Sequence, residues 1–347
     1  MVSSKNSGKV KRQGCRWRRR TAEAIALFFI ILLSVSPLIG TPALAGSSAA
    51  SPAHHPSTQA PSAVAPANRI VSFAPSNTEL LFSIGSGNRL LGVCTYCDYP
   101  KEAAAREKVG TFVSANMERL ARLKPDTIVL VSGQEGLASQ LKHNGFNVRL
   151  LVNNRLSDIG ANLRVLGQMT GRPSDADAIA AAFEKSLNSL HVLIASAHTQ
   201  PKIFYCVWPQ PLITVGNSSF LNDVITACGG TNVAANLSAG YPQFSAEKLL
   251  VSNPSIVVLP FESEKQNVLS RAPWTSLSAV KSHHYFYLPE TDKNLLMRPT
   301  LRIIDGMEWL SERLHPEIKT QLQKWRDDAN KAIKLASPKM LAPIPGK

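Results

Sequence analysis

The sequence predicts an α/β protein of two Rossmann-like lobes, each with a central parallel sheet, joined by one long backbone helix. Short β-branched runs alternate with amphipathic runs over residues 69–155 and again over 201–315, which is the pattern of parallel strands linked by helices. Residues 156–200, between them, have helical periodicity and no strand. A helix–proline–strand unit also occurs twice, because Glu118 and Glu247, each seven residues before a proline, are 129 residues apart.

In the first lobe, residues 69–155, turn and cap signals separate the elements. Ser76 to Glu79 has the sequence of a capping box, and Ser114 to Asn116 caps the run MERLARL, which Pro125 stops. The expected strands begin at residues 69, 90, 127 and 147, and the expected helices cover 79–85, 117–123 and 138–145.

The connecting segment, residues 156–200, is broken only near Gly171 to Pro173. The run from Asp175 to Ala197 predicts a helix of roughly 35 Å at about 1.5 Å per residue, long enough to cross a domain. Strands and helices then alternate again over residues 201–315, and a C-terminal helix and tail occupy 316–347.

The N-terminus has the features of an export signal. Basic residues precede the apolar run AIALFFIILLSV, and Ala43 to Ala45 is a small-x-small cleavage site, so residues 1–45 are predicted to be a cleavable signal peptide. Residues 46–68 are rich in Ala, Ser and Pro and predict a disordered linker. We therefore expect a periplasmic or otherwise extracytoplasmic protein.

Charge and motifs exclude several function classes. Residues 1–45 hold eight Lys/Arg and one Glu, so half of the formal charge of +14 leaves with them. The remaining charge forms no dense basic patch interleaved with aromatics, and we expect no nucleic-acid partner. GxSxG, HExxH and P-loop motifs are absent, which disfavours an enzyme without excluding one.

Cys94 and Cys97 form a Cys-x-x-Cys sequence that leaves several readings open. The pair could form a disulfide, remain two thiols, contact a ligand or supply half of a metal site. No second pair of ligands follows at zinc spacing. We therefore expect a disulfide or two thiols and no metal site.

Several motifs occur in the order found in one known family. SFAPSNTELLFSIG, GVCTYCDYP, KVGTF with NMERLARLKPDTIVL, ACGGTNV and YPQFSAEKLL, between residues 69 and 314, resemble the periplasmic binding proteins of ABC importers. The strongest resemblance is to the cobalamin-binding members of the iron-siderophore, haem and cobalamin class. It implies a helical-backbone (class III) fold, with cobalamin or a related corrinoid bound between the lobes as transported ligand and no catalytic cofactor.

The resemblance also implies ligand-binding residues. Aromatic rings can cover the broad face of a corrin, and polar groups can bind the amides at its edge. The matching positions are Tyr96, Phe112, Trp208, Tyr241, Asp292 and Arg298. Each ring could instead pack locally, and the loop around Asp292 is longer than in the relatives.

The repeated glutamates gain a role by the same resemblance. In relatives, one Glu on each lobe meets arginines of the permease dimer, and Glu118 and Glu247 match these positions. Each could instead only stabilise the N-terminus of its helix. We expect a monomer that docks on an ABC permease dimer.

Two alternatives stay open. A haem or ferric-siderophore binder of the same class would have the same fold, and Tyr96 could serve as an axial ligand of haem. A metal-chelatase-like enzyme on a similar fold is the alternative from another class.

Overall fold

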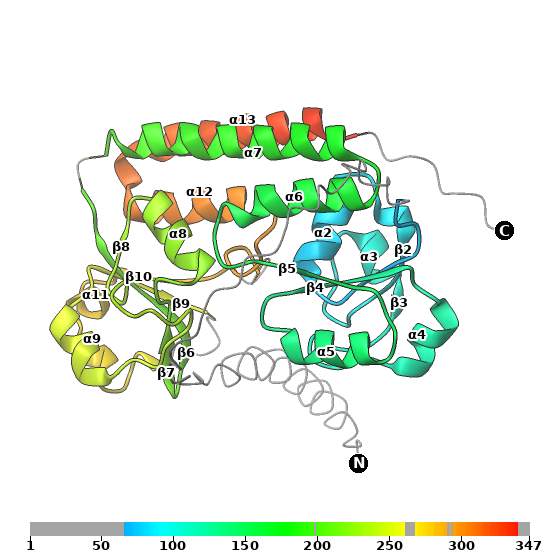
Figure 1. The fold of residues 1–347 in the computed structure, drawn as a ribbon. Helices are drawn as coiled ribbons and strands as arrows, with labels where there is room; N and C mark the ends of the chain where they lie inside the picture. The colour runs from blue at the N-terminus through cyan, green and yellow to red at the C-terminus, as the bar shows by residue number, and fades with distance from the viewer. Residues whose placement is uncertain (1–65, 198, 261–267, 290–291, 293, 339–347) are drawn as a thin grey trace, which may run out of the picture. The chain divides into compact units, whose positions relative to one another are not determined.

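The computed structural model describes residues 66–338 except 198, 261–267, 290–291 and 293 (Figure 1). The predicted signal peptide, and the predicted linker up to residue 65, lie outside the described residues. Residues from Ala67 onward form one compact unit. Ala67 is buried, and its N–H donates to the carbonyl of Met169 at 2.8 Å, so the packed body begins two residues before the expected boundary.

The first lobe contains a five-stranded parallel sheet of order β3-β2-β1-β4-β5. Its central strands consist almost entirely of buried β-branched and leucine side chains, as expected when helices cover both faces. The elements are β1 (Ile70–Ser72), α2 (Pro75–Ser83), β2 (Leu90–Val93), α3 (Lys101–Ala104), β3 (Glu107–Lys108), α4 (Met117–Leu123), β4 (Thr127–Val131), α5 (Glu135–His143) and β5 (Val148–Leu151).

The expected capping box in the first lobe is wrong. Helix α2 begins at Pro75, with Ala74 as a cap that has no side-chain hydrogen bond. Proline is favoured in the first turn because its missing N–H would have no partner there. Glu79 therefore lies inside the helix, where its buried carboxylate is used by residues of the other lobe.

The second lobe has the sheet order β10-β9-β6-β7, with β8 paired to β6. Strand β7 runs antiparallel to β6, so this sheet departs at one edge from the expected parallel arrangement. Phe204 on β6 packs against Phe244 and Trp274, with ring centroids 5.5 and 6.0 Å apart. The elements are β6 (Lys202–Pro209), β7 (Leu212–Thr214), α8 (Phe220–Ala227), β8 (Thr231–Asn232), α9 (Ala246–Ser252), β9 (Ile256–Leu259), α11 (Ser278–Lys281) and β10 (Tyr285–Tyr287).

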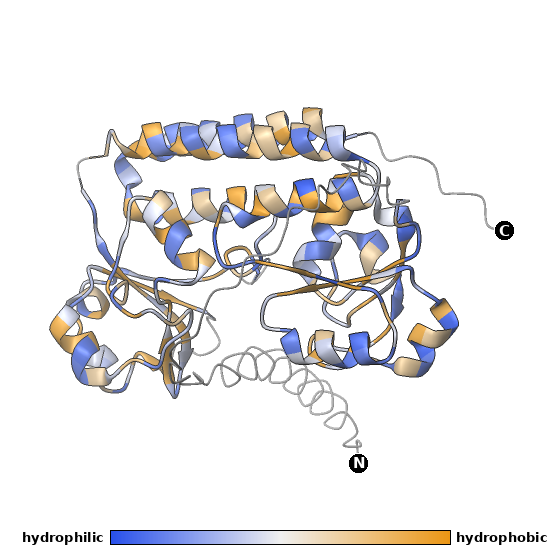
Figure 2. Ribbon diagram, viewed as in Figure 1, coloured by the Kyte–Doolittle hydropathy of each residue, from blue (hydrophilic) through white to orange (hydrophobic). Residues whose placement is uncertain are grey.

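A layer of helices lies along one side of both sheets (Figure 1). It contains α6 (Asp158–Met169), α7 (Pro173–Ile194), α12 (Ile303–Leu314) and α13 (Lys319–Ala336). The connector α7 packs along α13, and the buried indole N–H of Trp325 on α13 donates to the carbonyl of Ser186 on α7 at 2.8 Å. Figure 2 shows apolar and polar residues alternating along both helices, which is typical of amphipathic helices with one buried face.

The repeat found in the sequence is also a structural repeat. Helices α4 and α9 are each capped by a side chain, because Asn116 accepts from the N–H of Arg119 and Ser245 from that of Lys248. Both helices end at a residue with left-handed backbone, Lys124 at φ 45° and Asn253 at φ 38°. After each helix, the chain turns at the proline into an inner strand of that lobe's sheet.

Candidate functional site

The two lobes meet through a cluster of charged side chains. Glu79 on α2 of the first lobe is only 4% exposed, and it accepts hydrogen bonds from two arginines of the second lobe. Arg298 donates to it at 3.0 Å, and Arg302 donates through Nε and Nη2 at 3.0 and 3.1 Å. A buried carboxylate is stable only when it is paired in this way. This pairing therefore ties α2 to the segment that leads into α12.

Two further carboxylates complete the cluster. Asp98, in the loop after β2, accepts from Nη1 and Nη2 of Arg298 at 2.6 and 3.3 Å. Asp292 accepts from Nη1 of Arg302 at 2.6 Å. Each guanidinium is thus held between carboxylates, a geometry that matches the planar fork of arginine donors. We call Glu79, Asp98, Asp292, Arg298 and Arg302 the interlobe cluster.

The surroundings keep both arginines charged. Burial works against the charge of Arg298, but its hydrogen bonds to Asp98 and the charges of Asp98 and Glu79 outweigh burial and raise its pKa. Burial likewise opposes the charge of Arg302, and Glu79 and Asp292 raise its pKa. The two side chains are cations at any physiological pH.

Aromatic residues of the first lobe lie beside this cluster. The carbonyl of Tyr96 accepts from Nη2 of Arg298 at 3.2 Å. The ring centroid of Tyr99, a residue that is about half exposed, lies 4.2 Å from the guanidinium carbon of Arg302, a cation–π contact. Tyr96, Asp98 and Tyr99 all come from one loop at the carboxyl end of β2, the end of a parallel strand at which ligands commonly bind.

Phe112 belongs to a second loop of the first lobe. Its carbonyl accepts from the side-chain amide of Gln134, which also donates to the carbonyl of Phe73 at the end of β1. Gln134 is buried. This amide therefore fixes the loop that carries Phe112 against the central strand, while the ring of Phe112 keeps part of its surface exposed.

The two predicted rings of the second lobe are placed by local contacts. Trp208, at the end of β6, donates from Nε1 to the carbonyl of Gln210 at 2.7 Å. Tyr241 lies before α9. Burial raises the pKa of its hydroxyl, and a hydrogen bond with Ser219 opposes part of this shift. The hydroxyl of the buried Tyr205 on β6 donates to Sδ of Met297 at 3.4 Å, which links β6 to the segment that carries Arg298.

Several residues in the cluster or beside it were not predicted as site residues from the sequence. Asp98 and Tyr99 follow a strand end, which is a usable signal. Glu79 was assigned to a helix cap, and its partners lie 219 and 223 residues further along the chain, a separation that leaves no local pattern. Asp292 and Arg298, both predicted as ligand-binding residues, belong to the cluster, where each forms ion pairs with other members.

The two cysteines of the same loop are buried free thiols in the structure. Their Sγ atoms are 3.2 Å apart, and the hydroxyl of Thr78 donates to Cys97 at 3.2 Å. The hydrogen bond with Cys97 and burial raise the pKa of the Cys94 thiol. A disulfide between them stays a prediction, which alkylation and mass spectrometry of the exported protein would test. Within the described part of the chain, no group of three or more His, Cys, Asp or Glu could hold a metal ion.

The repeated glutamates lie far from this cluster. Glu118 and Glu247 are exposed in the first turns of α4 and α9. These helices lie at opposite ends of the unit, on the side away from α7 and α13 (Figure 1). The backbone N–H of Glu247 and the hydroxyl of Ser245 lower the pKa of Glu247, so this carboxylate is an anion at neutral pH.

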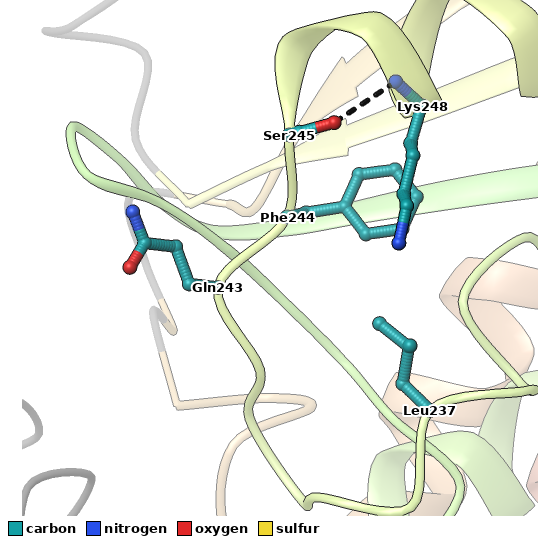
Figure 3. Close-up of a pocket in the computed structure, with 5 residues that line it drawn as sticks. All are labelled: Leu237, Gln243, Phe244, Ser245 and Lys248. Carbon is teal, nitrogen blue, oxygen red and sulfur yellow. Dashed lines mark hydrogen bonds between the residues drawn. The ribbon is translucent and has the colours of Figure 1, made fainter.

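A pocket of about 350 Å³ opens at the start of α9 (Figure 3). Leu237 and Phe244 supply apolar walls, and Gln243, Ser245 and Lys248 supply polar ones. Figure 3 shows the side-chain ends of Leu237 and Lys248 facing each other across the open space, on the same side of the Phe244 ring. The pocket belongs to the second lobe and is not part of the interlobe cluster.

Comparisons with known proteins agree with this architecture. Residues 70–291 match the family described as Periplasmic binding protein. The chain is 31% identical to the vitamin B12-binding protein of Vibrio cholerae over 246 residues, covering 70% of this chain and 87% of that protein. It is also 31% identical to the uncharacterized ABC transporter substrate-binding lipoprotein YvrC of Bacillus subtilis, covering 72% of this chain and 80% of that protein.

A solved structure matches the fold over most of its length. The crystal structure of the periplasmic vitamin B12 binding protein BtuF of Vibrio cholerae superposes with a TM-score of 0.63 at 29% identity, covering 77% of this chain and 99% of that one. In the part of this chain that the structure describes, no helix is long and apolar enough to cross a membrane. The expected two-lobed fold with a helical backbone is confirmed, and the chain belongs to the periplasmic binding protein family.

Proposed function

We propose that this chain is an extracytoplasmic solute-binding protein of an ABC importer, which binds cobalamin or a related corrinoid between its lobes and delivers it to the permease. The observation that carries the proposal is the interlobe cluster, with Tyr96 and Tyr99 beside it, in a chain whose relatives include vitamin B12-binding proteins. A ligand bound beside this cluster would contact both lobes.

The proposed ligand chemistry follows from the residues expected to bind it. Tyr96, Phe112, Trp208 and Tyr241, two from each lobe, are each partly exposed. Rings of this kind bury broad apolar faces and keep a polar atom available. Asp292 and Arg298 lie between the two lobes and are proposed to bind the polar edge of the ligand. A macrocycle with flat apolar faces and amide edges fits this combination.

Delivery is proposed to use Glu118 and Glu247. One exposed carboxylate at each end of the unit suits a two-fold symmetric partner with cationic sites. Solvated charge pairs orient a complex and speed its formation while adding modest affinity, which suits a carrier that must dissociate. In this proposal the protein acts as a monomer in the periplasm or its equivalent, after removal of residues 1–45.

The test is titration calorimetry of the mature chain with cyanocobalamin, dicyanocobinamide, haem and a ferric siderophore. We expect saturation at one corrinoid per chain, and no turnover of the ligand. Trp208→Ala should weaken corrinoid binding by about 5- to 150-fold, the equivalent of roughly 1–3 kcal/mol for one large buried ring. Trp208→Phe, which keeps a ring, is the matched control.

The outcomes separate the alternatives. Binding of haem or siderophore alone would overturn the corrinoid assignment and favour another ligand of the same class. Failure to bind any of the four compounds would contradict the proposal as a whole. Conversion of a ligand by catalytic amounts of protein would favour the chelatase-like alternative.

A further inference from the structure

The interlobe cluster has more negative than positive groups. Three carboxylates, Glu79, Asp98 and Asp292, face two guanidinium groups, Arg298 and Arg302. The exposed part of the cluster is even more acidic than this count indicates. Arg298 is 12% exposed, whereas the side chain of Asp98 is 62% exposed. A ligand that approaches the cluster from solvent therefore meets a carboxylate first.

The arginines are already occupied by the protein. Arg298 uses Nη1 and Nη2 on Glu79, Asp98 and the carbonyl of Tyr96. Arg302 uses Nε and both terminal nitrogens on Glu79 and Asp292, and its face covers the Tyr99 ring. A ligand carboxylate that takes the terminal nitrogens of Arg298, or the donors of Arg302, must displace a protein carboxylate. Loss of a partner from buried Glu79 would be costly, because an unpaired buried charge is strongly destabilising.

We infer that Asp98 is a ligand-contacting residue that makes this site select ligands with amide edges over ligands with carboxylate edges. The inference rests on the proposed function and states how the site distinguishes one ligand from another. A carboxylate oxygen that accepts from Arg298 on one side retains lone pairs for N–H donors on the other. An amide N–H of the ligand can use them, whereas a ligand carboxylate is repelled by the same oxygens.

The size of the effect is set by the exposure of Asp98. Water screens a charge that is more than half exposed, so like charges several ångströms apart at such a site change a dissociation constant by roughly three- to tenfold. The effect should diminish as salt is raised, because the screening length shortens. Haem, with two carboxylates, should be disfavoured more strongly than a ligand with one.

The experiment compares two forms of one macrocycle, so that shape is held constant. Affinities are measured for cyanocobalamin and for its monocarboxylic acids, in which mild hydrolysis has converted one edge amide to a carboxylate. The proteins are wild type, Asp98→Asn and Glu102→Gln. Glu102 is exposed in α3 and lies outside the cluster, so Glu102→Gln makes the same change in net charge elsewhere in the lobe.

We expect wild type and Glu102→Gln to prefer the amide form by roughly three- to tenfold, and Asp98→Asn to lose most of that preference. Equal binding of both forms by wild type would overturn the inference, and so would an unchanged preference in Asp98→Asn. If Asp98→Asn does not fold, Asp98→Ser, which also removes the carboxylate, takes its place in the comparison. Failure of cyanocobalamin to bind wild type at all would instead contradict the proposed function.

Discussion

The α4–β4 unit of the first lobe and the α9–β9 unit of the second have the same backbone plan and different surfaces. Around α4, Arg119 and Arg122 both pair with Glu107, so the surface beside Glu118 is densely charged. Around α9, Leu250 is exposed and Val251 is 87% exposed, so the surface of this helix carries apolar side chains. Both lobes need the same backbone plan to connect a helix to a central strand, whereas the exposed faces of the two helices are free to differ.

The largest effect should come from the buried leucine that anchors each helix. Leu120 on α4 and Leu249 on α9 are both fully buried. Replacing either with alanine should lower the free energy of unfolding by about 2–5 kcal/mol, because it removes apolar contacts and leaves a cavity. Urea unfolding of Leu120→Ala and Leu249→Ala measures both costs. Costs that differ by more than a factor of two would show that the two units are packed differently despite their common plan.

The glutamates test whether the two surfaces share one function. Glu118→Ala combined with Glu247→Ala should lower ligand uptake at least about tenfold, on the scale of one to several kcal/mol for interface charge pairs. Ligand affinity should stay near that of wild type, because neither residue lies in the interlobe cluster. Transport into vesicles that contain the permease measures the effect, with Glu102→Ala as the control. Normal uptake by the double variant would refute docking through these residues.

The single variants sharpen the comparison. If apolar contacts of Leu250 and Val251 assist docking at the surface around α9, Glu247→Ala should impair uptake less than Glu118→Ala. Val251→Ser should then impair uptake while leaving stability within about 0.5 kcal/mol, as is usual for an exposed site. Equal uptake by both single variants, with no effect of Val251→Ser, would mean that only the charges matter.

Helix caps should have smaller and nearly equal effects. Asn116→Ala and Ser245→Ala each remove a side chain that accepts from a backbone N–H, at 2.9 and 3.1 Å. Each should cost about 1 kcal/mol of unfolding free energy. Asn116→Ser and Ser245→Asn, which keep a capping oxygen, should restore most of it. A cost in only one lobe would show that only one of the two caps is formed in solution.

The smallest effect concerns the left-handed residue after each helix. Lys124 and Asn253 both have positive φ, and this backbone disfavours a residue with a Cβ, lysine more than asparagine. Lys124→Gly should stabilise the protein by up to about 1 kcal/mol, and Asn253→Gly by less, because glycine also loses more entropy on folding. Thermal unfolding would detect the difference, and destabilisation by both substitutions would contradict the argument.

Short-range features could be predicted because their causes are local. The cap at Asn116, the stops at Pro125 and Pro254, the alternation of strands and helices and the connector all depend on neighbouring residues; the connector, expected from Asp175, begins at Pro173. The glutamate repeat was visible for the same reason. The cap predicted at Ser76 is wrong although its local sequence pattern fits. The helix begins one residue earlier, at Pro75, and Glu79 pairs with the distant Arg298 instead of with the helix N-terminus.

The sequence by itself determined the two-lobed α/β architecture, the connecting helix and the positions of Glu118 and Glu247. The tertiary structure alone decided that α13 supports the connector and that Glu79 pairs with Arg298 and Arg302. It also brought Asp98 and Tyr99 of the first lobe to these arginines. The physical reason is that periodicity and caps act over a few residues, whereas these contacts join residues far apart in the sequence and depend on how the two lobes pack together.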